Sequence, residues 1–275
     1  MDSEQRLAAI RSLTNAMQAD LDTLPEEQWS TPSDCAGWTI AHAVVHLVQV
    51  AELVTDSIQR GRAGDHGAPP LAASEGIPAW RAARTKRNAE LAAQSPAELA
   101  RLFREQCGNV QTAFATIPGA PEGARAWHPA GDQPLVWYED QWLFECALHD
   151  WDMRAPRDPD ARIREGCLAA FAETLPPRLG RGFKGADVPI LAGRYRIEFE
   201  QPQFAWVTNI PGDGTISYDL VYAFATDVTI RTDPTAFALV MTNRRPAQEF
   251  SNAGRWDMYG ASERAMGFCE AFQSY

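Results

Sequence analysis

Apolar residues recur every three or four positions through the first two-thirds of the chain, which predicts a series of amphipathic helices. The first is expected from Ser3 to about Leu21, where Pro25 follows as a stop signal. The second is expected after Thr39, an N-cap residue, in a segment that is apolar nearly all round. Further helices are expected at about 78–93, 95–118, 141–152 and 160–175. This succession predicts an up-and-down helical bundle.

The segment 95–98 gives the clearest helix start. Ser95 stands three residues before Glu98, and Pro96 takes the first helical position, which is the pattern of a capping box with proline at N1. The run 61–76 is rich in Gly, Pro and Ala and has no periodicity. We therefore expect a loop there, placed to cover a site.

The pattern changes after residue 180 from helical spacing to alternation. Residues 195–200 alternate with period two, 204–210 are β-branched and aromatic, 211–214 form a turn, and 216–231 carry further strand-like runs. A short helix is expected from Asp233 to about 243–245, and a closing helix at 261–272. The sequence thus predicts an α+β protein, with a helical bundle at 1–180 and a small α+β domain at 188–275.

Composition and charge narrow the class of protein. The chain has 275 residues, 45% of them hydrophobic, and a formal net charge of −11, which argues against a general nucleic-acid binder. Its five cysteines are widely spaced and odd in number, as expected of reduced thiols. The N-terminus is acidic and polar, and no apolar run approaches a membrane span. We expect a cytoplasmic monomer or homodimer that acts on a small molecule, without nucleic-acid or membrane partners.

The helix at 141–152 carries the main chemical signal. Glu145 and His149 are four residues apart and therefore share one face of a helix that is apolar on its neighbouring face. A buried carboxylate needs a partner, and a divalent metal ion is the most direct one for this pair. The alternative is a Glu–His hydrogen bond in a polar core.

The second helix repeats the signal. His42 and His46 stand at i and i+4 in a segment that is otherwise apolar, so both rings can point toward one ion. The alternative is that such a histidine is a core residue bonded to a backbone carbonyl.

Two segments together resemble a known family. The segment 37–46, GWTIAHAVVH, and the segment 145–152, ECALHDWD, resemble the DinB/YfiT-like metal-binding bundle, and within it the mycothiol-dependent maleylpyruvate isomerase family. The C-terminal part, with its segment 241–245 and closing helix, is similar to the sterol-carrier-like domain of those proteins. The resemblance implies that His46, Glu145 and His149 bind zinc or another divalent metal. It also implies that Arg244 serves in catalysis, with Arg245 as the alternative.

The resemblance further implies a thiol mechanism. Three protein ligands leave one position of a tetrahedral zinc open, and a thiol bound there is deprotonated. Mycothiol would then be the cosubstrate, adding to a small electrophile as an isomerase or S-transferase. Trp38 and Trp142 are expected to line its site, together with Trp151. We expect Arg244 to hold a carboxylate of the acceptor, unless it is only a cation at a helix C-terminus.

Supporting roles and rival functions complete the expectations. His42 and Asp152 are candidates to orient the ligand imidazoles. Cys35 and Cys146 are expected to be structural thiols. Two other functions fit the same residues: a thiol-independent metalloenzyme of specialised metabolism, and a protein that binds an apolar ligand with a structural metal site.

Overall fold

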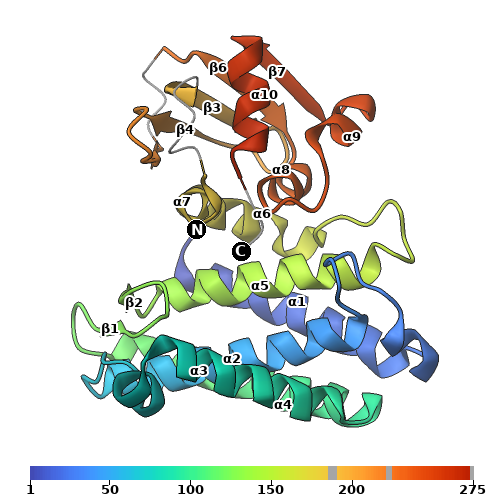
Figure 1. The fold of residues 1–275 in the computed structure, drawn as a ribbon, viewed down its shortest axis with the longest axis vertical. Helices are drawn as coiled ribbons and strands as arrows, with labels where there is room; N and C mark the ends of the chain where they lie inside the picture. The colour runs from blue at the N-terminus through green and yellow to red at the C-terminus, as the bar shows by residue number, and fades with distance from the viewer. Residues whose placement is uncertain (185–190, 221–224, 273–275) are drawn as a thin grey trace. The chain divides into compact units, whose positions relative to one another are not determined.

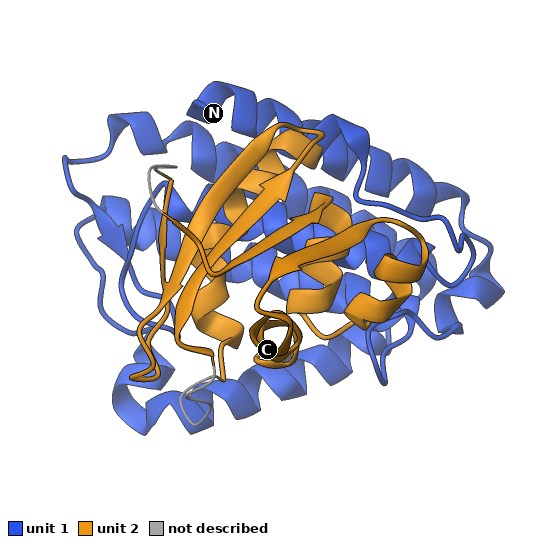
Figure 2. Ribbon diagram, turned by 90° about the horizontal axis from the view of Figure 1, so that it is seen from above, with its two compact units in different colours: residues 1–167 blue, residues 168–275 orange. Residues whose placement is uncertain are grey.

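The computed structural model describes residues 1–184, 191–220 and 225–272, and it divides into two compact units (Figure 2). Unit 1 is Met1–Cys167 and unit 2 is Leu168–Tyr275. The division falls inside helix α6 (Glu165–Thr174), before the predicted boundary at 180–188. The change of periodicity marks where strands begin along the chain. It does not mark where the packing divides, because most of α6 belongs with the strands that follow it.

Unit 1 is a bundle of long helices, as expected from the helical spacing (Figure 1). Helix α2 packs against α3, α4 and α5, and α1 packs against α4 and α5. Two short strands, β1 and β2, pair antiparallel before α5. The elements are α1 (Ser3–Thr23), η1 (Glu26–Ser30), α2 (Ile40–Arg62), α3 (Pro70–Ala92), α4 (Pro96–Ala115), η2 (Ile117–Gly119), β1 (Arg125–Ala126), β2 (Gln133–Pro134) and α5 (Trp137–Arg154).

Two predicted N-caps are confirmed. The Thr39 side chain accepts a hydrogen bond from the backbone N–H of His42, so α2 begins where the sequence indicated. Ser95 caps α4 in the same way, accepting from the Glu98 N–H. The predicted capping box is not closed, however, because the Glu98 carboxylate pairs with Arg101 at 2.7 Å.

Helix α3 differs from the prediction. It begins at Pro70 rather than 78, so part of the run expected to be a loop is helical. Two helical segments meet at a kink, where Gly76 has φ +86° and Pro78 follows. A glycine adopts this φ without steric cost, and a proline suits the first turn of the segment after it. A Gly/Pro pair in sequence therefore marked a kink here.

Unit 2 contains a five-stranded mixed sheet, which confirms the α+β fold class (Figure 1). The strand order is β5-β4-β3-β6-β7, with β3 and β6 parallel and the other pairs antiparallel. Its elements, besides most of α6, are η3 (Pro176–Arg178), α7 (Leu179–Gly182), β3 (Gly193–Phe199), β4 (Phe204–Ile210), β5 (Ser217–Asp219), β6 (Val228–Thr232), α8 (Pro234–Met241), α9 (Ala247–Asn252), β7 (Trp256–Gly260) and α10 (Ser262–Glu270).

Alternation along β3 places Tyr195 and Phe199 on the buried face of this sheet. Phe237 of α8 lies edge-on to Trp206 of β4, with ring centroids 5.2 Å apart, and Tyr195 stacks on Phe268 of α10 at 4.7 Å. Aromatic contacts thus fix α8 and α10 to one face of the sheet. No helix in the described part of the chain is long and apolar enough to cross a bilayer.

Candidate metal centre

Helices α2 and α5 bring His46, Glu145 and His149 together within unit 1. Glu145 Oε2 lies 3.3 Å from His46 Nε2 and 3.7 Å from His149 Nε2. The two imidazole centroids are 4.8 Å apart, and one ligand atom from each residue lies within 4.8 Å of the others. Two imidazoles and a carboxylate are a donor set suited to zinc and similar divalent ions, so these residues fit a single metal ion.

The local sequence explains this convergence. Most of α5 is buried, so the face that carries Glu145 and His149 points inward as the spacing predicted. His46 projects from α2, which packs against α5. The side chain of His149 is 7% exposed, whereas that of His46 is 30% exposed. The site is therefore accessible from the His46 side, where a small molecule can approach.

Two neighbours hold the carboxylate and one imidazole in place. The Gln141 amide donates to Glu145 Oε1 at 2.6 Å, which leaves Oε2 facing the histidines. Asp152 Oδ2 lies 2.8 Å from His149 Nδ1, which directs Nε2 toward Glu145. Such partners are typical of metal-binding histidines and carboxylates. Gln141 was not predicted to support the site, although its position four residues before Glu145 in a buried helix was a signal.

The loop before α2 covers the same residues. The indole of Trp38 stacks on His149, with centroids 5.5 Å apart and planes at 15°, and lies 5.1 Å from His46. The backbone N–H of Asp34 donates to the Asp152 carbonyl, which ties this loop to α5. Cys35 lies within 4.8 Å of ligand atoms of His149 and Asp152, close enough to form a second potential ligand group with them.

The structure gives the surroundings of three other predicted site residues. His42 is exposed in the first turn of α2, where Nδ1 accepts from the Thr39 N–H at 3.1 Å. Its ring therefore serves the helix cap and does not contact the ligand imidazoles. Trp142 is fully buried in α5. Arg244 follows α8 in unit 2, where its backbone N–H donates to the Leu239 carbonyl, and its part in catalysis stays a prediction.

Partial burial affects the pKa of one of the two imidazoles. The pKa of His46 is lowered, mainly by burial and further by the charges of His149 and Arg84, although the bond to Glu145 opposes the shift. A lowered pKa keeps the imidazole neutral and able to coordinate a metal ion at neutral pH. Complete burial raises the pKa of the Cys146 thiol well above its usual range. Cys146 is therefore held as a thiol, as expected of a structural cysteine.

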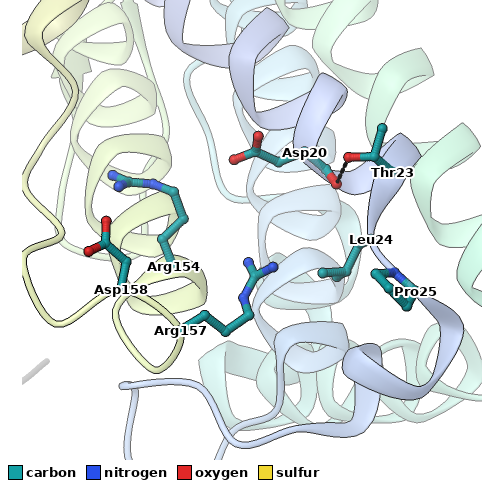
Figure 3. Close-up of a pocket in the computed structure, with 7 residues that line it drawn as sticks. All are labelled: Asp20, Thr23, Leu24, Pro25, Arg154, Arg157 and Asp158. Atoms are coloured by element: carbon teal, nitrogen blue, oxygen red, sulfur yellow. Dashed lines mark hydrogen bonds between the residues drawn. The ribbon is translucent and has the colours of Figure 1, made fainter.

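A pocket of about 260 Å³ lies apart from these residues, at the ends of α1 and α5 (Figure 3). Figure 3 shows Thr23 bonded to the Asp20 carbonyl at its rim. Two of its charged groups are paired within unit 1, since Arg154 binds Asp150 and Asp20 binds Arg164. It contains none of the predicted site residues and is lined by Asp20, Thr23, Leu24, Pro25, Arg154, Arg157 and Asp158.

The fold and the site together define an α+β protein whose helical bundle carries a candidate metal centre. The sequence profile of the mycothiol maleylpyruvate isomerase N-terminal domain matches residues 10–154, which is more than half of the chain. The chain belongs to the mycothiol-dependent maleylpyruvate isomerase family.

Solved structures agree with this assignment at the level of fold. A crystal structure of mycothiol-dependent maleylpyruvate isomerase superposes with a TM-score of 0.61 at 14% identity, covering 89% of this chain and 90% of that one. A histidine-to-alanine variant of that enzyme gives 0.60 at 14% identity, with 90% and 91% covered. A sterol carrier protein 2 like 2 structure from Aedes aegypti, 14% identical, covers 38% of this chain and 95% of its own, with a TM-score of 0.29. That score is too low to test the sterol-carrier-like assignment of unit 2. No curated protein sequence matches the chain.

Proposed function

We propose that this protein is a metal-dependent enzyme that uses mycothiol to act on a small electrophile bearing a carboxylate. The observation that carries the proposal is the convergence of His46, Glu145 and His149, with Gln141 and Asp152 supporting two of them. Family membership supports the thiol, because the solved relatives are named as mycothiol-dependent isomerases.

The chain supplies three ligands, as expected of a catalytic site that keeps one coordination position free. Zinc or another divalent ion bound there would hold a thiol as its thiolate at neutral pH. Asp152 accepts the Nδ1 proton of His149 and so keeps Nε2 available for coordination. Trp38 stacks on His149 and contacts His46, so it would help to hold both imidazoles in position. Arg244, or Arg245 beside it, would bind the acceptor carboxylate.

The chemistry balances without any further reactant. The thiolate adds to one carbon of an activated double bond, forming a C–S bond, and the electron pair moves to the activating carbonyl as an enolate. The former carbon–carbon double bond is then a single bond, and rotation about it changes the geometry. Cleavage of the C–S bond returns the thiolate and gives the other geometric isomer. If the enolate is protonated instead, the adduct is kept and the enzyme is an S-transferase.

The experiment is a titration of the cobalt-substituted enzyme with mycothiol, followed by absorption spectroscopy. Sulfur entering the coordination sphere should produce a thiolate-to-cobalt charge-transfer band. Cys35 lies near His149, so the titration is repeated on Cys35→Ser to exclude a band from the protein's own thiol. A band that appears in both proteins supports the proposal. An unchanged spectrum would replace it by the thiol-independent metalloenzyme.

A further inference from the structure

Arg84 of α3 lies against α2, about one helical turn from His46. The Gln49 amide donates to the Arg84 carbonyl at 2.9 Å, and Arg84 Nη1 donates to the Gln49 carbonyl at 3.3 Å. Gln49 follows His46 by three residues, which is a rise of about 4.5 Å along the helix and the same face. A cation from a third helix is thus held about one turn of α2 from His46.

This arginine lacks the partner that comparable arginines have. In the described ranges of the chain, no carboxylate lies within 4.0 Å of its guanidinium, although burial lowers the pKa of Arg84. By contrast, the partly buried Arg154 pairs with Asp150 at 2.8 Å, and Arg255 pairs with Asp233 at 2.8 Å. The carboxylate that acts on Arg84 from a distance is that of Glu52, which pairs with Arg87 at 3.2 Å. A partly buried cation without a carboxylate in contact is costly, and an anionic ligand would offset that cost.

Aromatic residues hold the guanidinium in place of a carboxylate. It lies over the ring of Trp80, 5.1 Å from the centroid, and Trp80 meets Trp127 edge-on at 5.2 Å. Cation–π stacking orients an arginine without using its N–H donors. The Nη1 bond to the Gln49 carbonyl occupies one donor, so the fork keeps N–H groups that can bind a planar carboxylate.

We propose that Arg84 binds a second carboxylate of the acceptor, apart from the one assigned to Arg244 or Arg245, so that unit 1 itself helps to hold an anionic substrate. That the bound carboxylate belongs to the acceptor rests on the proposed function. That Arg84 binds an anion does not rest on the proposed function. The rival role is structural, in which Arg84 only ties α3 to α2.

The test is calorimetric titration of the zinc-loaded protein with maleate, a small dicarboxylate, in the absence of thiol. Arg84→Gln keeps an N–H donor for the Gln49 carbonyl but removes the charge, so maleate binding should weaken about 10-fold to 100-fold. The matched control is Arg81→Gln, about one turn earlier on α3, where Arg81 is exposed. This control should bind maleate as the wild type does. The neutral diamide maleamide should bind neither to the wild type nor to the control variant.

Equal maleate affinity in wild type and Arg84→Gln would overturn the proposal. Equal weakening in Arg84→Gln and Arg81→Gln would overturn it too, because the effect would then be one of overall charge. If Arg84→Gln does not fold, Arg84→Lys keeps the charge and loses the planar fork. Maleate should then bind to Arg84→Lys at least several-fold more weakly than to Arg81→Lys, and equal affinity in the two would overturn the proposal.

The cobalt spectrum separates this inference from the proposed function. Arg84→Gln should retain the mycothiol-induced band while it loses maleate binding, because Arg84 is not a metal ligand. A wild-type protein that binds maleate through Arg84 but shows no band with mycothiol would retain the inference and lose the thiol mechanism. If mycothiol gives the band but Arg84→Gln does not change the maleate affinity, the thiol mechanism is retained and this inference is lost.

Discussion

At the scale of single residues, two hydrogen bonds support the candidate metal centre. Gln141 fixes Glu145, and Asp152 fixes the tautomer of His149. We expect Gln141→Leu and Asp152→Asn each to weaken zinc binding about 10-fold to 100-fold, as loss of such partners does in metal sites. Competition with a chromophoric chelator measures the affinity. His42→Ala is the control, because His42 contacts Thr39 instead. Wild-type affinity in both variants would contradict this account of the site.

Helical spacing predicted which ligand side chains share a face, but not what else lies near them. Glu145 and His149 point the same way because they are four residues apart on a buried helix. The same rule misplaced His42, since His42 is exposed in the first turn of α2 and its ring serves the cap. Cys35 reaches His149 through tertiary packing of a loop, which spacing does not encode.

At the scale of elements, the N-cap of α2 matters because this helix carries His46. Thr39→Ala removes the acceptor for the His42 N–H and should lower the free energy of unfolding by about 0.5–2 kcal/mol. Thr55→Ala is the matched control on the same helix, since the Thr55 hydroxyl is buried without a hydrogen bond in the described chain. It should cost nothing or stabilise slightly, because alanine is the better helix former. Urea unfolding of the two variants tests this, and equal losses would contradict it.

Glu139 links α5 to α1 and should give stability a characteristic pH dependence. Its carboxylate accepts from the Ser3 hydroxyl and lies 3.6 Å from Arg6, yet burial raises its pKa above the usual 4.5. A raised pKa means that stability present at low pH is lost as pH rises through the folded-state value. The melting temperature of Glu139→Gln minus that of wild type should therefore increase as the pH rises from about 4 to about 7.

The control for this pH dependence is Glu98, whose pKa is lowered mainly by its hydrogen bond to Arg101. The melting temperature of Glu98→Gln minus that of wild type should decrease as the pH rises, which is the opposite trend. Calorimetric melting across this pH range measures both. The same trend in the two variants would contradict the assignment of burial as the dominant effect at Glu139.

Periodicity predicted the long helices and the main strands, and it failed where elements are short or interrupted. The first segment of α3, before the kink at Gly76, lies in the run 61–76, whose Gly, Pro and Ala content and lack of periodicity predict a loop. Helix α9 has six residues, and β7 is an edge strand with only one buried residue, so neither gives a periodic signal. Strand pairing that is distant in sequence fixes β7 beside β6.

At the scale of the whole molecule, the contribution of unit 2 to catalysis stays a prediction. Arg244→Ala should leave metal content and the mycothiol spectrum unchanged. It should lower kcat/KM for a carboxylate acceptor about 10-fold to 100-fold, because an arginine–carboxylate contact is charge-assisted. Arg245→Ala is the control, since Arg245 lies 3.7 Å from Glu249, a residue of α9. A wild-type value in Arg244→Ala with a loss in Arg245→Ala would transfer the role to Arg245.

The switch from helical to alternating spacing was sufficient to predict an α+β chain. It did not predict that the packing divides inside α6, because compactness depends on contacts between elements rather than on their periodicity. The residues at 37–46 and 145–152 indicated the family because they carry both halves of the candidate metal centre, and the profile match over 10–154 includes both segments.

Metal content after zinc loading tests the central claim most directly, with wild type, Glu145→Gln and Cys35→Ser compared by mass spectrometry. The account predicts about one zinc per chain in wild type and in Cys35→Ser, and a large loss in Glu145→Gln, because a neutral amide is a poor zinc ligand. The pair is informative because His149 belongs to both potential ligand groups, whereas Glu145 and Cys35 each belong to one. Full zinc in Glu145→Gln, with or without loss in Cys35→Ser, would contradict a metal centre built from His46, Glu145 and His149.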